Sequence, residues 1–485
     1  MVKIGKNSVK INMVMNALLT MSSFIFPLIT FPYISRILLP SGTGKVNFVT
    51  SIVNYFAMFA QLGIPTYGIR ACAKVRDDKE KLSRTVHELL FINIFMCILV
   101  YIVFFFAVFN VPRMKQDKAL YMIIGISIAM NALGMEWLYK ALEQYTYITI
   151  RSLIFKAIAL IAMFLFVKEQ KDYLVYGGIS VFAASASNIL NFLNLRKYII
   201  LTPLDNYNFR QHIKMVITFF SMSIATTIYT NLDSVMLGVM KSDADVGYYG
   251  AAVKIKNILI SLVTSASSVL LPRASFYVDR RMLDEFYRLL KKTMHIVVLL
   301  ACPFTVYFIV FAKEGIFFLS GEAYAGSIIP MQIIMPTLIF VGMSNIIGIQ
   351  MLVPLGLEKQ VLYSEIVGAI VDFILNAMFI PRLASAGAAV GTLVAEMVVL
   401  IWQLRVIRDR KVNLYSEIKV YKILSAVSVA SAASIWVKGI AIPYFLILLI
   451  SSVCFFTGYG IVLVVLKEKI VTELLQNIIK RLNLT

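Results

Sequence analysis

Long apolar runs recur along this 485-residue chain, and they constrain its fold more than any other feature. A helix needs about 20 mostly apolar residues to cross roughly 30 Å of hydrocarbon, and about fourteen runs meet that length. Hydrophobic residues make up 60% of the chain and charged residues 15%, so water is not its main solvent. The sequence therefore predicts an all-α polytopic membrane protein. The predicted spans are residues 12–35, 46–69, 86–110, 119–139, 146–167, 173–195, 215–240, 247–271, 293–312, 325–353, 361–380, 386–404, 420–437 and 441–466.

The net charge of +20 is distributed unevenly between alternate loops. With the N-terminus placed inside, about 31 of the 46 Lys and Arg residues fall in inside segments, about 10 in outside segments and about 5 within spans. This bias predicts that both termini are cytoplasmic. Membrane topology and contact with anionic lipids explain the basic charge, so nucleic acid is not expected as a partner.

The connections between the spans are too short for a catalytic domain, because no predicted loop exceeds roughly 20 residues. The segment Gly42–Lys45 lacks the first glycine and the final Ser or Thr of a phosphate-binding loop. The four cysteines are isolated, and the three histidines are far apart without metal-ligand spacing. We therefore expect no cofactor and no metal, and a transporter rather than an enzyme.

An internal repeat is indicated by a gap-free offset of 203 residues. Five identities fall in the 28 positions from 44 to 71, among them Gly44 with Gly247 and Asn54 with Asn257. The matched segments follow the first and the seventh spans, so both halves begin inside, as in parallel repeats. We expect one six-helix lobe over residues 1–205 and a second over 206–410, both around a central cavity. Residues 411–485 would add two transmembrane helices and a cytoplasmic tail.

Polar residues recur at helical spacing on one face of four spans. Packing between membrane helices also uses Ser, Thr and Asn, and it explains each stripe taken alone. Four stripes at the starts of both lobes favour a water-filled cavity, with Asn54 and Asn257 as candidate substrate-binding residues. The stripes are Asn12, Asn16 and Thr20; Asn47, Ser51 and Asn54; Ser223, Thr226, Thr230 and Asp233; and Lys254, Asn257, Ser261, Thr264 and Ser268.

Ionisable residues inside membrane spans cost about 3 kcal/mol or more and usually mark the path of a substrate or an ion. Lys254 continues a polar stripe, whereas Arg36 and Lys156 are equally able to extend to a membrane surface. Several cations around one cavity would bind an anion, and phosphate is the obvious anion in a membrane. The candidate substrate-binding cations are Arg36, Arg151, Lys156, Lys254 and Lys256.

A second set of ionisable residues concerns ion coupling or gating. Asp233 is the lone acid on the polar face of its span, and Glu365 and Asp372 lie one heptad apart on another span. These acids are candidates for carrying protons or sodium ions, although helix packing explains the latter pair equally well. Arg70 and Arg273 occupy equivalent cytoplasmic helix ends. They either cap carbonyl groups and set topology, or draw an anion to the inward-facing mouth.

Short motifs spread over most of the chain carry a family resemblance. They are Phe31–Leu38, Gly44–Phe48, Leu62–Ile64, Tyr67–Arg70, Glu136–Tyr139, Leu142–Glu143, Asn231–Asp233, Met236–Gly238, Gly247–Tyr249, Lys254–Ile255, Leu271–Arg273, Gly387–Ala389 and Gly391–Thr392. In this order they resemble Wzx-type flippases of O-antigen and capsule repeat units, in the multidrug/oligosaccharidyl-lipid/polysaccharide exporter superfamily. The resemblance implies two six-helix lobes that work by alternating access, and undecaprenyl-diphosphate-linked oligosaccharides as substrate, in a bacterial cytoplasmic membrane.

Three classes of function remain open at this point. The flippase is favoured by the cations and by the order of the motifs, with membrane lipids as partners, H⁺ or Na⁺ as candidate coupling ions and the polysaccharide polymerase machinery as a candidate partner. A MATE-like exporter of drugs or organic cations would instead need acids to dominate the cavity. A membrane-embedded enzyme would need a large external loop with catalytic groups, and the short loops place it last.

Overall fold

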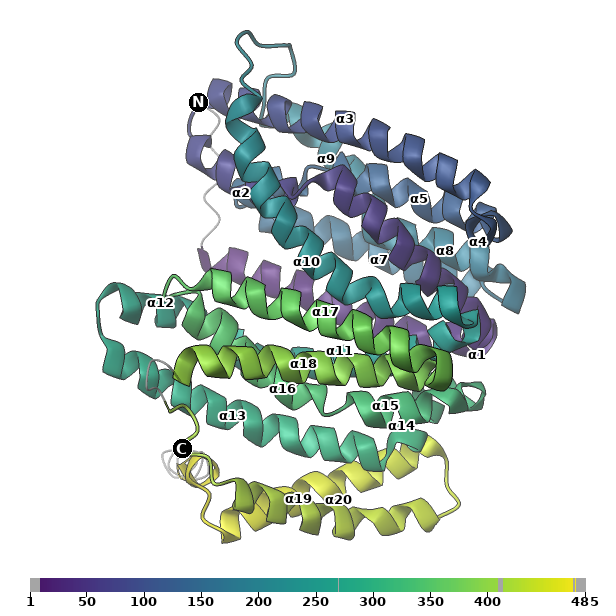
Figure 1. Ribbon diagram of the computed structural model, residues 1–485, viewed down its shortest axis with the longest axis vertical. Helices are drawn as coiled ribbons and strands as arrows, with labels where there is room; N and C mark the ends of the chain where they lie inside the picture. The colour runs from purple at the N-terminus through teal and green to yellow at the C-terminus, as the bar shows by residue number, and fades with distance from the viewer. Residues whose placement is uncertain (1–8, 269, 409–412, 474–475, 477–485) are drawn as a thin grey trace. The chain divides into compact units, whose positions relative to one another are not determined.

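The computed structural model describes residues 9–268, 270–408, 413–473 and 476, and every regular element in them is helical. The chain divides into two compact units, Met1–Gly247 and Tyr248–Thr485 (Figure 1). The first unit contains α1 Val9–Gln61, α2 Ile64–Val75, α3 Lys79–Asn110, α4 Pro112–Gln116, α5 Lys118–Ala132, α6 Glu136–Ala141, α7 Tyr145–Phe166, α8 Tyr173–Val181, α9 Asn188–Asn194 and α10 Arg210–Met240. Helix α11, Asp243–Ser268, begins in the first unit and continues into the second. The second unit contains α12 Leu271–Asp279, α13 Leu283–Val310, α14 Ala312–Ser320, α15 Ile328–Ile334, α16 Thr337–Asn345, α17 Glu358–Leu383, α18 Ser385–Arg408, α19 Val420–Ile435 and α20 Tyr444–Val465.

The helices that could span a membrane follow the predicted spans closely. Within the described residues, twelve stretches are long and apolar enough, and a bent pair, Glu322–Ile334 with Thr337–Leu352, makes a thirteenth. The all-helical membrane fold is therefore confirmed, while this count does not reach the fourteen predicted spans. The difference lies at the start of the chain, where one stretch, Ile11–Val75, covers the two predicted spans 12–35 and 46–69.

Helix α1 changes direction at Leu39. This residue has φ 58° and ψ 176°, which are not helical, and Pro40 follows it. A straight α-helix of 53 residues would be about 80 Å long, far more than the hydrocarbon thickness of a bilayer. The break divides α1 into two arms (Figure 1); the first contains the predicted span 12–35, and the second ends at Gln61, so the predicted span 46–69 continues into α2.

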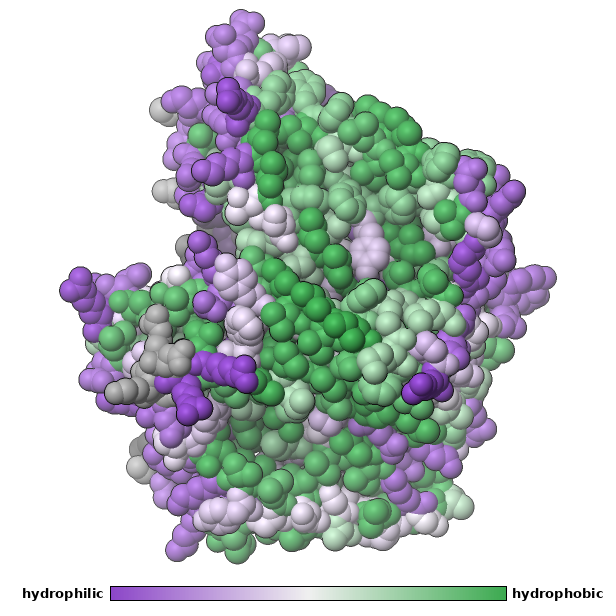
Figure 2. Space-filling model, viewed as in Figure 1, coloured by the Kyte–Doolittle hydropathy of each residue, from purple (hydrophilic) through white to green (hydrophobic). Residues whose placement is uncertain are grey.

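The outer surface of each unit is apolar along the middle of its helices. Figure 2 shows hydrophobic side chains over the central parts of the helices and hydrophilic side chains toward their ends. On α3, for example, Ile102 exposes 62% of its surface and Phe106 exposes 69%. Contiguous apolar surface of this extent is costly in water and is favourable against lipid.

A pair of glycine contacts joins the two matched segments of the internal repeat. A β-carbon on Gly44 would lie 1.7 Å from the carbonyl oxygen of Asp243, and one on Gly247 would lie 2.0 Å from that of Pro40. The offset of 203 residues relates Gly44 to Gly247 and also relates Pro40 to Asp243, so each contact is the counterpart of the other. Such reciprocity is what a two-fold relation between similar segments produces. Only glycine permits so close an approach of two backbones.

The compact units differ from the predicted lobes in where the chain is divided. The division between the units falls after Gly247, near the start of α11, whereas the sequence predicted a lobe boundary at residue 205, before α10. Helix α10 is counted with the first unit because it packs along α1, where the ring of Phe48 fills the space beside Gly238. The six-helix lobes and the separate segment 411–485 stay predictions.

Helices α19 and α20, predicted as two additional spans, attach to α13 in the second unit. The Tyr307 hydroxyl donates to the carbonyl of Leu448 at 3.0 Å, and the Tyr459 hydroxyl donates to the carbonyl of Leu299 at 3.0 Å. Both tyrosines are buried, so each hydroxyl has the partner that a buried polar group requires.

Candidate functional site

A polar cavity of about 310 Å³ lies in the first unit, between α1, α2, α5 and α10. Seven of its lining side chains are amides or hydroxyls, and none of the lining residues is ionisable. Amides and hydroxyls exchange hydrogen bonds with water and with sugar hydroxyls at similar cost. The lining residues are Asn54, Ala57, Met58, Gln61, Gly63, Pro65, Thr66, Asn131, Ser223, Thr227 and Asn231.

The predicted binding residue Asn54 lines this cavity. Its side-chain nitrogen donates to the side-chain oxygen of Asn231 at 3.1 Å. Asn231 in turn donates to the carbonyl of Thr227 at 3.0 Å and accepts from Asn54, so its orientation is fixed. The pair bridges α1 and α10. The side-chain oxygen of Asn54 and its second amide proton take no part in this hydrogen bond, so they can bond to a ligand.

The cavity face of α10 shares Ser223 with the stripe expected from the sequence, and its other two members differ. Ser223, Thr227 and Asn231 follow a spacing of four residues and line the cavity. Thr226 and Thr230, members of the predicted stripe, are exposed and donate to carbonyls of their own helix at 3.2 and 2.9 Å. A search at strict i, i+4 spacing finds the face of α10 that lines the polar cavity.

Arg151, predicted to bind substrate, is buried, and both terminal nitrogens of its guanidinium have polar partners. Its guanidinium donates to Glu136, Ser187 and Asn188, each at 3.2 Å. Asn188 also donates to Asn131, which lines the polar cavity, at 3.4 Å. The charge of Arg151 is therefore compensated, and its position is that of a support behind the cavity wall.

Lys156 lies one and a half turns further along α7 in a different situation. Its half-buried ammonium donates to the hydroxyls of Ser22 at 2.8 Å and Ser23 at 3.1 Å, both on α1. Among the described residues, no carboxylate pairs with Lys156 within 4.0 Å. The middle of a span thus carries a cation held by hydroxyls alone.

The remaining predicted arginines are exposed. Arg36 donates to the carbonyl of Pro32 in its own helix at 2.5 Å. Arg70 and Arg273 lie on α2 and α12, and Arg273 donates to the Tyr277 hydroxyl at 3.1 Å. Their exposure leaves all three guanidiniums accessible, and none is placed in the wall of the polar cavity.

The loops near Arg70 are fixed by charged groups outside the spans. Arg76 donates to Glu143 at 2.7 Å, and this hydrogen bond raises the pKa of Arg76. Asp78 accepts backbone N–H groups at the start of α3, chiefly that of Lys81, which lowers the pKa of Asp78. The Arg76–Glu143 pair thus links the end of α2 to the segment before α7, and Asp78 caps the start of α3.

The three predicted residues of α11 lie on one helix turn. Lys254 and Lys256 are half-buried and Asn257 is exposed. The two lysines are about 200° apart around the helix axis, so they address different surroundings. Nearby hydroxyls of the predicted stripe, Ser261 and Thr264, donate to carbonyls of their own helix.

The predicted acids differ in burial. Asp233 and Asp372 are buried, and Glu365 is half-buried. In the second unit, a β-carbon on Gly391 would lie 2.9 Å from a carboxylate oxygen of Asp372 and 2.4 Å from the amide oxygen of Asn376. The glycine of α18 therefore makes the room in which Asp372 is buried. No group of three or more His, Cys, Asp or Glu in the described part of the chain is placed to hold a metal ion.

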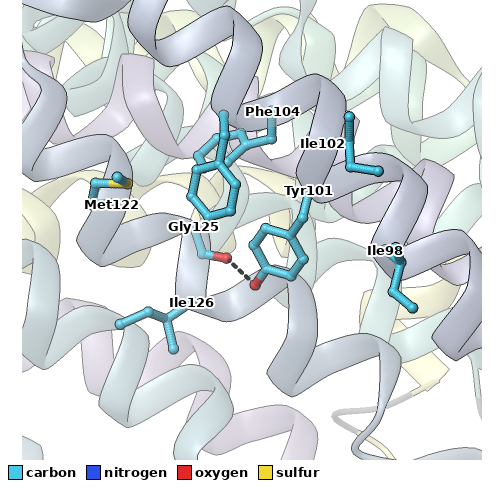
Figure 3. Close-up of a pocket in the computed structure, with 8 residues that line it drawn as sticks. Ile98, Tyr101, Ile102, Phe104, Met122, Gly125 and Ile126 are labelled. Atoms are coloured by element: carbon cyan, nitrogen blue, oxygen red, sulfur yellow. Dashed lines mark hydrogen bonds between the residues drawn. The ribbon is translucent and has the colours of Figure 1, made fainter.

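A second hollow, of about 630 Å³, is apolar and lies between α3 and α5 (Figure 3). The Tyr101 hydroxyl donates to the carbonyl of Gly125 at 3.0 Å and accepts from the amide of Ala129 at 3.2 Å. Its one polar side chain is thus engaged by α5, which leaves hydrocarbon walls. This groove suits a lipid chain and offers nothing to a polar head group.

Curated proteins are similar to this chain in sequence. The "Putative O-antigen transporter" of Escherichia coli (strain K12) is 23% identical over 409 residues, which cover 84% of this chain and 98% of that protein. The protein of the same name from Shigella dysenteriae is 23% identical over 401 residues, covering 80% and 97%.

Two solved structures show the fold. The lipid II flippase MurJ, in its inward closed conformation, has a TM-score of 0.74 at 14% identity and covers 95% of this chain and 100% of that chain. An inward-facing multidrug resistance MATE family transporter of the MOP superfamily has a TM-score of 0.59 at 13% identity, covering 82% and 99%. The family model described as "Polysaccharide biosynthesis protein" matches residues 9–278, more than half of the sequence. This chain therefore belongs to the polysaccharide biosynthesis protein family of membrane proteins.

Proposed function

We propose that this chain flips undecaprenyl-diphosphate-linked oligosaccharide repeat units from the cytoplasmic to the outer leaflet by alternating access, for cell-surface polysaccharide synthesis. Its family, its O-antigen transporter relatives and the fold that it shares with the lipid II flippase support a transporter rather than an enzyme.

The polar cavity of the first unit suits the sugar part of such a substrate. Moving one unpaired hydroxyl into hydrocarbon costs on the order of 4 kcal/mol, so several sugars face a barrier of tens of kcal/mol. The side-chain amides of Asn54, Asn131 and Asn231 replace the lost water without imposing a charge. Uncharged hydrogen-bonding groups also release the head group again, which transport requires.

Lys156 is the observation that carries the proposal. An ammonium in the middle of a span is expensive unless something compensates it, and its neighbours Ser22 and Ser23 are neutral. A diphosphate beside these residues would gain an ion pair with the Lys156 ammonium, while the hydroxyls of Ser22 and Ser23 donate to the carbonyl of Leu19. We assign the diphosphate to this position, and we propose that Lys254, Lys256 and Asn257 supply further contacts.

The acids are proposed to couple transport to an ion. Asp372, buried beside Gly391, must either pair with a cation or take up a proton. Proton or sodium binding at Asp372, with Glu365 on the same helix, would then favour one conformation of the transporter. Asp233 on α10 has the same choice, and we propose that it links binding to the conformational change.

The orientation of the chain follows from its basic loops. We propose that both termini face the cytoplasm of a bacterial plasma membrane, with Arg70 and Arg273 at the inward-facing mouth. Outward movement of a negative head group from an inside-negative cell gains about 2.3 kcal/mol per charge per 100 mV. The membrane potential would therefore assist the flip.

A MATE-like exporter of organic cations is the alternative, because MATE transporters share the fold. Such a cargo would favour carboxylates in the cavity wall. The lining residues of the described cavity include none. The polymerase machinery remains a candidate partner of a flippase and would have no role beside a drug exporter.

Reconstituted vesicles test the proposal. The purified protein is combined with a polyprenyl-diphosphate oligosaccharide that carries a fluorophore on the sugar, and a membrane-impermeant reductant reports the outer-leaflet fraction. We expect flipping by the wild type, a loss of tenfold or more in Lys156→Gln, and activity retained in Lys156→Arg. Lys168→Gln is the matched control, because the ammonium of Lys168, just after the end of α7, donates to the backbone carbonyl of Phe164. Transport of an organic cation without flipping of the lipid would overturn the proposal.

A further inference from the structure

Four charged side chains gather at the ends of the helices that the positive-inside pattern places outside. Lys45 lies on α1 just after its break, Arg113 on α4, Asp117 before α5, and Asp243 at the start of α11. We name these four residues the outer charge cluster. All lie in the first unit.

Arg113 lies between the two carboxylates of the outer charge cluster. It forms an ion pair with Asp243 and lies 3.9 Å from Asp117. Asp117 is also paired with Lys45 at 3.0 Å. The two carboxylate side chains are only 7% and 15% exposed, so these pairs are screened far less than surface ion pairs.

The backbone beneath the outer charge cluster is closed by the glycine contacts described above. The β-carbon that Gly44 lacks would overlap the carbonyl of Asp243 itself. Arg113 lies over the ring of Phe48 at 5.0 Å, and that ring fills the space beside Gly238 of α10. The turn between α10 and α11 is thus held against α1 and α4 by one ion pair and by backbone contact.

We propose that the Arg113–Asp243 ion pair is a latch that keeps the outer end of the transporter closed, and that opening transfers Arg113 from Asp243 to Asp117. This inference rests on the alternating access in the proposed function, since a closed outer end must open for release. The turn before α11 moves away from α1 and α4, and Gly44 and Gly247 separate with it.

The second carboxylate is what makes the latch reversible. Breaking a buried ion pair by removing one partner leaves an uncompensated charge, which is strongly unfavourable. Asp117 is already near Arg113, so the guanidinium keeps a carboxylate in both states. The two states then differ little in charge compensation, and a substrate or ion can shift the balance between them.

Accessibility of the polar cavity from outside measures the latch directly. In a variant without Cys72, Cys97, Cys302 and Cys454, Thr227→Cys places one thiol in the cavity wall. Intact cells are treated with a membrane-impermeant maleimide, and inverted vesicles report access from the other side. We expect slow labelling from outside in the parent, and labelling several-fold faster in Asp243→Asn and Arg113→Gln.

Two further variants keep the test falsifiable. Lys115→Gln removes the same charge from an exposed residue of the same helix and should leave labelling unchanged. The exchange Arg113→Asp with Asp243→Arg should restore slow labelling, which a general loosening of the fold would not do. Equal labelling of Arg113→Gln and Lys115→Gln, or no restoration by the exchange, would overturn the latch. The labelling needs no sugar substrate, so it stays informative if the flippase proposal fails.

Discussion

The polar regions around Arg151 and around Lys156 lie on the same helix and differ in how the positive charge is compensated. Arg151 is buried with a carboxylate and two neutral acceptors in place, while Lys156 has only the hydroxyls of Ser22 and Ser23. A carboxylate partner is what a structural cation needs, and a cation held by neutral groups alone is suited to binding an anion. Two similar charges, five residues apart, therefore divide into one that holds the fold and one that is available to a ligand.

The sharpest break of this comparison is Arg151→Gln. The variant loses three hydrogen bonds and leaves Glu136 with Lys140 as its remaining ion-pair partner. We expect a destabilisation of about 2 kcal/mol or more. Thermal unfolding followed by size-exclusion fluorescence in detergent should show it, with Lys156→Gln melting like the wild type. A normally stable Arg151→Gln protein that no longer transports would reverse the two assignments.

A third polar region, around Asp372, sharpens the comparison because the buried residue there is an acid instead of a cation. We expect Asp372→Asn to bind substrate normally and to turn over about tenfold more slowly, since a neutral amide has no charge to exchange with a proton or sodium ion. Flipping rates measured against pH and sodium should become flat in this variant. Asp279→Asn, an exposed acid, is the control. An unchanged sodium and pH profile in Asp372→Asn would make Asp372 a packing residue.

A smaller effect is expected at the uncharged pair Asn54 and Asn231. Their shared hydrogen bond is worth about 1 kcal/mol, which corresponds to about a fivefold change in apparent substrate affinity. Each alanine variant should show this loss, and the double variant should be little worse than either one. Thr226→Ala, on the exposed face of α10, should have no effect. Fully additive losses would mean that the two asparagines do not act as a unit.

The smallest effect concerns the exposed arginines at equivalent helices. Arg70→Lys and Arg273→Lys retain the charge and lose the planar fork of donors. If these residues set topology and cap carbonyls, flipping should stay within about twofold of the wild type. A loss of tenfold or more in both variants would instead place a diphosphate at the mouth by two-pronged contacts.

The sequence predicted the features that depend on residues near each other in the chain. Helical spans follow from the length of an apolar run, and the break of α1 falls between two predicted spans near Pro40. Asn54 was predicted to line a polar cavity because it belongs to a stripe of polar residues at helical spacing, and it does line one. The groups that surround a cation come instead from segments distant in the sequence. Glu136 is 15 residues before Arg151, and Ser22 is 134 residues before Lys156, so no local pattern separates the two cations.

Asn131 shows the same limit for the cavity. It lies at the end of α5, where the helix stops and Met135 takes a left-handed φ of 45°. A hydropathy run does not show this break, which follows α5 just after the lining residue Asn131. Latch residues were also missed, because Arg113 and Asp243 lie in predicted loops and are 130 residues apart.

The reciprocal glycine contacts have an evolutionary consequence. In a symmetric homodimer, one surface patch meets its own copy, and every substitution in it alters the interface twice. Gly44 against Asp243 and Gly247 against Pro40 keep that geometry within one polypeptide. Once two copies are fused, each side can diverge alone. In this chain, position 40 carries the proline after a bend, and its counterpart at 243 carries a carboxylate that pairs with Arg113. In the predicted repeat, one ancestral site would thus have given rise to two different devices.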